Sequence, residues 1–295
     1  MDRFSGFADL YDSSRPTPPV ALGPLLVSYS GSESPAVVDL GSGTGLSTRW
    51  AATWAGSVIG VEPSDDMRER AEARPVAGVE YRRGHSHATG LADRSADVVV
   101  AVQAMHWMEP VSTLAEVARL LKPGGVFATV DADWPPVCGV VDAEAAWETL
   151  HRRIRVFEAR ASREELHAAL RRPIDCDDPV LLEEDLRDPH RNRAMPGGVQ
   201  SWSKAEHLDR IRASGAFRFA RELVFDQPID DGGPDRFIAL MRSQGSYQTL
   251  RRLGLTDDEL GATGFEQAVH VAFAETPAAR PMSFSWRVRL GVTPA

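Results

Sequence analysis

The chain has 295 residues, 42 of them acidic and 33 basic, which gives a formal net charge of −9 at pH 7. That charge argues against general affinity for nucleic acid or for an anionic membrane surface. The sequence has two cysteines, no apolar leader and no apolar run long enough to span a bilayer, so we expect a cytoplasmic protein.

Residues 36–134 repeat a short apolar run, a turn and an amphipathic helix. We expect strands at 36–40, 57–62, 79–84, 96–102 and 125–132. Nearly continuous apolar strands that alternate with helices are typical of a parallel sheet covered on both faces. Ser64 is expected to cap one helix and Pro110 to begin another.

The second half of the chain has a different pattern. Residues 135–215 are charged and helical, with an interval rich in Pro, Gly and Asp, and we expect a helical lid inserted after the fifth strand. Ser203 and Glu206 have capping-box spacing, which predicts a helix through Ser214. In residues 216–295, two alternating segments at 217–225 and 282–290 predict an antiparallel hairpin at the sheet edge, with helices between them.

These elements together define the expected fold class. It is α/β, with a doubly wound, mostly parallel, seven-stranded sheet of Rossmann-like form and a helical lid after the fifth strand. Residues 1–35 are expected to form an N-terminal segment with a first helix that folds over the ligand.

The stretch "VVDLGSGTGLSTRWAA", residues 37–52, places three glycines between a strand and a helix. Without Cβ atoms they let a ligand lie against the backbone, and the helix N-terminus presents unpaired N–H groups. Glu62, at the end of the next strand, can accept hydrogen bonds from ribose hydroxyls. Because of Glu62, we expect the ligand to contain a ribose. The third glycine comes one residue earlier than in a dinucleotide fingerprint, so the ligand need not contain a pyrophosphate.

With "VIGVEPSDDM", "VVVAVQAMHWM" and "VARLLKPGGVFA", this stretch resembles the class I S-adenosylmethionine-dependent methyltransferases. The resemblance covers residues 36 to about 132. "LYDSSRPTPP" and the His-Trp pair after the fourth strand are similar to the small-molecule branch of methyltransferase type 11, which includes trans-aconitate methyltransferase-like proteins. The resemblance implies methyl transfer to oxygen, nitrogen or carbon of a small organic acid or specialised metabolite.

The resemblance also implies a set of cofactor-binding residues. The glycine loop would wrap the amino-acid part of S-adenosylmethionine, Glu62 would hold the ribose, and Arg15 could pair with the cofactor carboxylate. Further residues would flank the adenine or border the methionyl moiety. The full set is Tyr11, Arg15, Asp39, Gly41, Ser42, Gly43, Gly45, Glu62, Pro63, Met67, His85, Ser86, Gln103, Ala104 and Trp107.

His85 departs from the family pattern, in which an aspartate at this position holds the adenine amino group. A neutral imidazole accepts through one nitrogen only, so Ser86 is the preferred adenine partner. His85 and His87 also have a spacing found in metal sites, but the sequence supplies no third ligand, and we expect no metal.

Three residues are candidates for roles beside the cofactor. His106 follows the fourth strand and could act as a general base or only shape the pocket. Tyr247 could line the acceptor pocket, and His207 could face the site. Alignment of donor and acceptor can supply much of the rate, so a base is not required.

Two alternative functions stay open at this stage. A non-catalytic cofactor-binding protein would keep the same binding residues, and an NAD(P)-dependent oxidoreductase would share the sheet and the acidic residue of the second strand. The sequence predicts a small-molecule partner and neither a nucleic-acid nor a membrane partner, and it leaves the oligomeric state open.

Overall fold

The computed structural model describes residues 14–161, 193–195, 199–229, 232–274, 276 and 281–295. Tyr11 and the middle of the expected lid, residues 162–192, lie outside the described residues. Within the described part of the chain, no helix is both long enough and apolar enough to cross a membrane.

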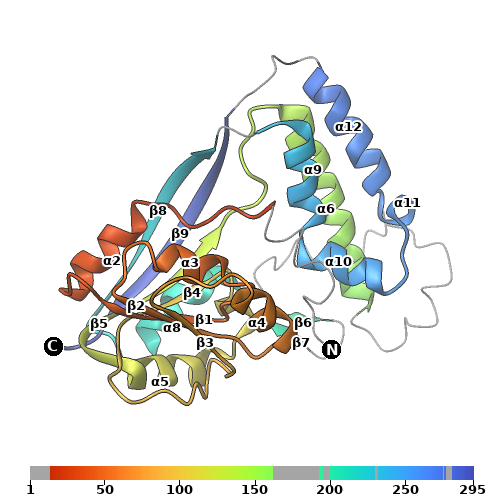
Figure 1. Ribbon diagram of the computed structural model, residues 1–295. Coiled ribbons are helices and arrows are strands. Elements are labelled where there is room, and N and C mark those ends of the chain that lie inside the picture. The colour runs from red at the N-terminus through yellow and green to blue at the C-terminus, as the bar shows by residue number, and fades with distance from the viewer. Residues whose placement is uncertain (1–13, 162–192, 196–198, 230–231, 275, 277–280) are drawn as a thin grey trace.

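One seven-stranded sheet forms the centre of the fold, in the order β3-β2-β1-β4-β5-β9-β8 (Figure 1). Strands β1 to β5 pair in parallel, whereas β9 runs antiparallel to both of its neighbours, β5 and β8. This arrangement confirms the predicted doubly wound, mostly parallel, seven-stranded sheet with an antiparallel edge. The strands are β1 (Ala36–Leu40), β2 (Ser57–Val61), β3 (Val79–Arg82), β4 (Ala96–Val102), β5 (Leu121–Ala132), β8 (Phe219–Ile229) and β9 (Met282–Val292).

Helices cover both faces of the sheet, as the apolar strands require. Alternate residues of a strand point to opposite faces, so Val37 and Val98 pack with one core cluster while Val38 and Val99 pack with another. The first cluster includes residues of α2 (Leu22–Ser30) and α3 (Leu46–Ala51), and the second includes residues of α5 (Pro110–Leu120) and α8 (His207–Ala213).

Helix starts follow the sequence signals in the parallel part of the fold. The Ser64 hydroxyl accepts a hydrogen bond from the Met67 N–H at the start of α4 (Asp65–Glu72), at 3.4 Å. Pro110 occupies the first turn of α5, and Glu109 accepts hydrogen bonds from the N–H groups of Val111 and Ser112. Both predicted starts are confirmed.

The predicted capping box at Ser203 is wrong. Residues Lys204–Glu206 form a single 3₁₀ turn, η4, for which the Ser203 side chain makes no capping hydrogen bond, and α8 begins only at His207. Glu206 does not reach back to the cap because its carboxylate pairs with Arg210, and the Arg210 guanidinium also donates to the Ser203 carbonyl at 3.0 Å.

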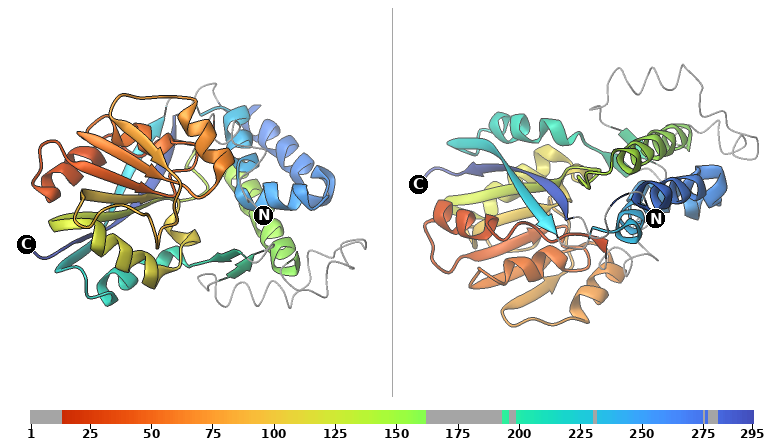
Figure 2. Two further views of the ribbon diagram at one scale, coloured as in Figure 1. Left: turned by 60° about the horizontal axis from the view of Figure 1, so that its bottom comes forward. Right: turned by 90° about the horizontal axis from the view of Figure 1, so that it is seen from above.

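A group of helices stands to one side of the sheet (Figures 1 and 2). It comprises α6 (Val141–Ala161), α9 (Pro234–Arg242), α10 (Gly245–Arg252), α11 (Asp257–Leu260) and α12 (Ala262–Ala274). Helix α6 follows β5, whereas the other four lie between β8 and β9, so this helical group draws on both the 135–215 and the 216–295 segments. Its role as a lid stays a prediction.

Trp147 of α6 lies at the centre of the helical group. Its ring stacks on Trp134 with centroids 6.1 Å apart and meets Phe237 and Phe265 edge-on at 5.0 and 6.2 Å. The side chain is 1% exposed. Trp147 therefore joins α6 to α9 and α12 and also to the segment that follows β5.

We expect Trp147→Ala to lower the free energy of unfolding by about 3–5 kcal/mol, because it removes a fully buried aromatic ring from this junction. Urea unfolding followed by circular dichroism measures the change. Val141→Ala on the same helix is the control, since Val141 is 77% exposed. Equal midpoints for the two variants would contradict the central position of Trp147.

Candidate functional site

A cavity of about 680 Å³ lies where the parallel strands end. Its wall follows the order of the sheet: His85 and Ser86 come after β3, Glu62 after β2, Gly43 after β1, and Gln103 after β4. Ligands of open α/β sheets bind at this carboxyl edge. The predicted residues that line the cavity are Arg15, Gly41, Ser42, Gly43, Glu62, Pro63, Met67, His85, Ser86, Gln103, Ala104 and Trp107.

The glycine loop brings bare backbone to the cavity. A Cβ atom on Gly43, whose φ is +54°, would meet nothing within 4 Å, so only the space of the cavity lies beyond this residue. A Cβ atom on Gly45, at φ +81°, would lie 2.2 Å from the Tyr81 hydroxyl. Gly45 is therefore needed for packing behind the loop and does not line the cavity, whereas Gly43 leaves room for a ligand.

Glu62 is held in place by the backbone on both sides. One carboxylate oxygen accepts from the Gly43 N–H at 2.9 Å, and the other accepts from the Ser64 N–H at 2.9 Å. The residue is 8% exposed and lines the cavity. These two hydrogen bonds fix the orientation of the carboxylate in the cavity wall. A vicinal diol fits such a fixed pair of oxygens.

Asp39 lies behind the loop and is absent from the residues that line the cavity. It is fully buried, and one of its oxygens accepts from the hydroxyls of Ser47 and Thr48, both at 2.7 Å. Burial raises the pKa of Asp39 to about 6, against the lowering effect of the two hydroxyls. The residue thus anchors the first turn of α3, and its predicted cofactor contact is at most indirect.

The adenine end of the predicted site holds two stacked imidazoles. The rings of His85 and His87 lie 5.4 Å apart with 23° between their planes, and both residues line the cavity. The Ser86 hydroxyl shares a hydrogen bond of 2.8 Å with the Thr113 hydroxyl. Met67, 4% exposed, closes the wall on this side together with Pro63.

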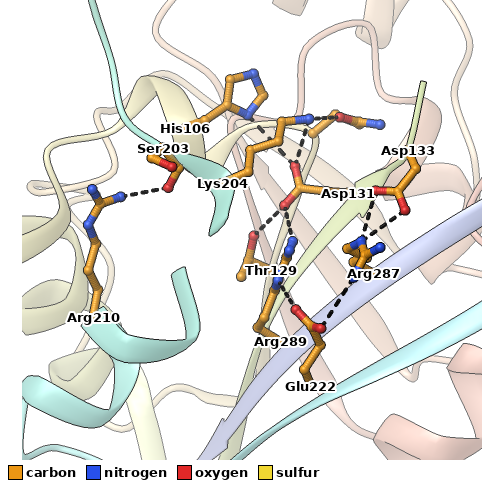
Figure 3. Close-up of polar contacts among 11 residues, drawn as sticks. His106, Thr129, Asp131, Asp133, Ser203, Lys204, Arg210, Glu222, Arg287 and Arg289 are labelled. Carbon is orange, nitrogen blue, oxygen red and sulfur yellow. Dashed lines mark hydrogen bonds and ion pairs between the residues drawn. The ribbon is translucent and has the colours of Figure 1, made fainter. Parts of the chain in front are cut away.

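A buried charge cluster surrounds Asp131 (Figure 3). The Asp131 carboxylate, 2% exposed, lies 3.1 Å from the Lys204 ammonium and 3.2 Å from the Arg289 guanidinium. Lys204 also donates a hydrogen bond of 2.8 Å to the Gln103 side-chain oxygen. Burial alone would raise the pKa of Asp131, but Lys204 and the other nearby positive groups outweigh it and hold that pKa well below its usual range.

His106 belongs to this charge cluster and is absent from the residues that line the cavity. Its Nδ1 lies 3.8 Å from the Asp131 carboxylate, and its side chain is 13% exposed. The ring packs against Trp107 at 4.6 Å, and it is Trp107 that lines the cavity. The structure therefore places the predicted base one layer behind the wall.

The other two candidates also lie away from the wall. His207 is 1% exposed, and burial lowers its pKa to about 4, so the ring is neutral at pH 7. Tyr247 is 2% exposed within the helical group, where its hydroxyl donates to the Asp257 carboxylate at 2.5 Å. The expectation that Tyr247 lines an acceptor pocket does not agree with this placement, because its hydroxyl is needed inside the helical group.

Several wall residues were missed by the sequence reasoning. Trp134 and Trp286 line the cavity at its β5 and β9 side, and Pro16 and Pro18 line it with Arg15. The Arg15 guanidinium lies 4.5 Å above the Trp134 ring and donates to the Ser243 carbonyl at 3.1 Å. A signal existed for Trp134, because it directly follows the fifth strand at the sheet edge where ligands bind. None existed for Trp286.

Comparison with known proteins agrees with this geometry. Residues 38–129 match a family model described as a methyltransferase domain. An uncharacterized methyltransferase of Mycobacterium tuberculosis is 34% identical over 123 residues, which are 41% of this chain and 49% of the relative. One from Synechocystis is 31% identical over 128 residues, 39% of this chain and 60% of the relative. The chain thus spans about half the length of the curated relatives it matches.

Solved structures extend the likeness of fold to nearly the whole chain. A protein of Anaeromyxobacter dehalogenans, provisionally named a type II methyltransferase, has a TM-score of 0.59 at 21% identity and covers 95% of this chain and 99% of its own. A protein of Anabaena variabilis, provisionally named a methyltransferase from an antibiotic biosynthesis pathway, has a TM-score of 0.57 at 16% identity, covering 93% and 97%. At these identities the likeness concerns the fold alone.

Asp39→Asn should alter the pH dependence of stability. A folded-state pKa of about 6, above the ordinary 3.8, means that the folded chain holds this proton more tightly than the unfolded chain does. The stability contributed by the protonated group is therefore present below about pH 4 and is lost as the pH rises to 6. Asparagine has no proton to lose.

The difference in unfolding free energy, variant minus wild type, should thus increase by roughly 3 kcal/mol between pH 4 and pH 7. Urea unfolding at steps of one pH unit measures it. A difference that stays constant over this range would show that Asp39 ionises in the folded protein as it does in the unfolded chain.

Proposed function

We propose that this chain, whose residues 38–129 match a methyltransferase-domain model, binds S-adenosylmethionine in the cavity and transfers its methyl group to a small molecule. The observation that carries the proposal is Glu62, fixed between Gly43 and Ser64 at the end of β2 with its carboxylate in the cavity wall. When bound, the cofactor supplies an electrophilic methyl carbon on a sulfonium.

The donor set around the cavity fits this cofactor. Glu62 offers two oriented oxygens for a ribose diol, and the open space beyond Gly43 admits a ligand against the backbone. Pro63 and Met67 supply apolar surface near His85 for a purine. A dinucleotide would need a cradle for its pyrophosphate, and the glycine spacing of this loop does not match that fingerprint. The wall therefore favours S-adenosylmethionine over NAD(P).

The residues of this chain would promote the reaction by positioning. Trp107 and Trp134 line the cavity, where both rings exclude water and the Trp107 ring can attract a sulfonium. His106 lies behind Trp107 instead of in the wall. This placement favours transfer driven by alignment of donor and acceptor over transfer that depends on a general base.

The acceptor is proposed to be a small organic acid or specialised metabolite, methylated in the cytoplasm. The first support is the concave, tryptophan-lined end of the cavity. The second is the helical group, whose Trp147 stacks on the wall residue Trp134 and which we propose acts as a lid. The third is the net charge of −9, which disfavours polynucleotides.

Calorimetric titration with S-adenosylmethionine and, separately, NADH tests the choice of cofactor. We expect heat of binding with the sulfonium compound and none with NADH. Release of S-adenosylhomocysteine during a screen of organic acids, phenols and amines then tests turnover. Binding of NADH alone would overturn the proposal, and cofactor binding without turnover of any acceptor would point to a non-catalytic cofactor-binding protein.

Glu62→Gln should weaken binding of S-adenosylhomocysteine about tenfold or more, because the ribose hydroxyls lose a charged acceptor. The amide keeps one oxygen for the loop, so the fold should survive. Calorimetry measures the affinity, with Glu69→Gln as the control, since Glu69 is an exposed residue of α4 that does not line the cavity. Equal affinity of the two variants would remove Glu62 from the ribose site.

A further inference from the structure

Gln103 stands in the cavity wall in an unusual backbone conformation. Its φ is +52°, and Arg94 is the only other non-glycine residue with positive φ in the described part of the chain. The Gln103 N–H donates to the Val130 carbonyl at 2.8 Å, which fixes the end of β4 against β5. Such conformations cost free energy and persist where the surrounding structure holds them, often at functional sites.

The side chain of Gln103 is held as firmly as its backbone. The Lys204 ammonium donates to the amide oxygen at 2.8 Å. Because an ammonium has donors only, the oxygen branch of the amide must face Lys204 and the NH₂ branch must face elsewhere. A ligand that contacts the Gln103 amide in the cavity therefore meets a hydrogen-bond donor.

Lys204 itself is fixed by two further contacts. Its ammonium lies 3.1 Å from the buried Asp131 carboxylate, which Arg289 holds from the other side at 3.2 Å (Figure 3). The segment that carries Lys204 is also docked on the loop after β4, where the Trp202 N–H donates to the His106 carbonyl at 2.8 Å. The ammonium is thus held within hydrogen-bond distance of Gln103 by Asp131 of β5 and by the docking of its segment on the loop after β4.

The order of the wall decides which part of the cofactor lies at Gln103. With the ribose at Glu62 after β2 and the adenine toward His85 after β3, the amino-acid end extends the other way, past β1 to β4. That end carries a carboxylate, which accepts hydrogen bonds, and an ammonium, which only donates them. An amide NH₂ group can bind the carboxylate and not the ammonium.

We propose that Lys204 is a positioning residue that turns the Gln103 NH₂ group toward the methionyl carboxylate of the cofactor. This inference rests on the proposed function, since it assumes that the cavity binds S-adenosylmethionine. It assigns a role to a residue far from the cofactor motifs in sequence, 101 positions after Gln103. Lys204 is also one of only two lysines in the chain.

The binding of two nucleosides distinguishes a positioning role of Lys204 from a purely structural role. S-adenosylhomocysteine carries the methionyl carboxylate, whereas 5′-methylthioadenosine has the same adenosine and thioether sulfur but no amino-acid group. Lys204→Met keeps the length of the side chain and removes its donors. We expect this variant to bind S-adenosylhomocysteine about tenfold more weakly in calorimetry and to bind 5′-methylthioadenosine as the unaltered protein does.

The second lysine supplies a matched control. Lys122 pairs with Asp97 at 2.9 Å and does not line the cavity, so Lys122→Met removes a lysine–aspartate pair without touching Gln103. It should bind both nucleosides like the unaltered protein. Gln103→Leu, which keeps the Lys204–Asp131 pair, should show the same selective loss as Lys204→Met and serves if the latter does not fold.

The results distinguish failure of the inference about Lys204 from failure of the proposed function. Equal weakening of both nucleosides in the Lys204 and Gln103 variants would reduce Lys204 to a structural role, and unchanged binding of S-adenosylhomocysteine would remove Gln103 from the carboxylate site. Either result would overturn the inference while leaving the proposed function intact. Failure of the unaltered protein to bind either nucleoside would instead overturn the proposed function itself.

Discussion

The buried carboxylate of Asp131, at the end of β5, holds the antiparallel strands and the turn before α8 against the parallel part of the sheet. Asp131 is 2% exposed, and an ionised carboxylate removed from water needs cations and donors around it. Arg289 comes from β9 and Lys204 from the turn before α8, and Arg289 also donates to Glu222 of β8 at 2.7 Å. Charge neutralisation of a single group thereby ties the antiparallel edge and a distant turn to the parallel core.

The two sides of the cavity are built in different ways. Gly43, Glu62, Ser86 and Gln103 come from successive strand ends within the 38–129 stretch, so short-range sequence rules place them. Arg15 and Trp286 come from opposite ends of the chain, and Trp134 leads out of the core toward α6. The backbone of the first side therefore depends on the sheet, although the Gln103 side chain is also held by Lys204, whereas the second side depends on contacts between remote segments.

This difference explains how much could be predicted from the sequence. The strands around Val38 and Val99 are apolar on both faces, and the loop at Gly43 has a distinctive spacing, so the sheet and the place of Gly43 in the cavity wall could be predicted. Tyr247 could not be placed, because nothing in the residue pattern indicates that its hydroxyl is bound by Asp257 inside the helical group. The contact of Lys204 with Gln103 could not be predicted either, because the two residues lie 101 positions apart and nothing local indicates it.

Trp134 lines the cavity and also contacts the helical group. Its ring lies under the Arg15 guanidinium and stacks on Trp147, which sits in the core of the helical group. Local opening of the helices would expose one face of a wall residue, so a compound bound against Trp134 would make that opening more costly. Backbone amides of α6 would then exchange their hydrogens more slowly when the cavity is filled, although the bound compound need touch no residue of that helix.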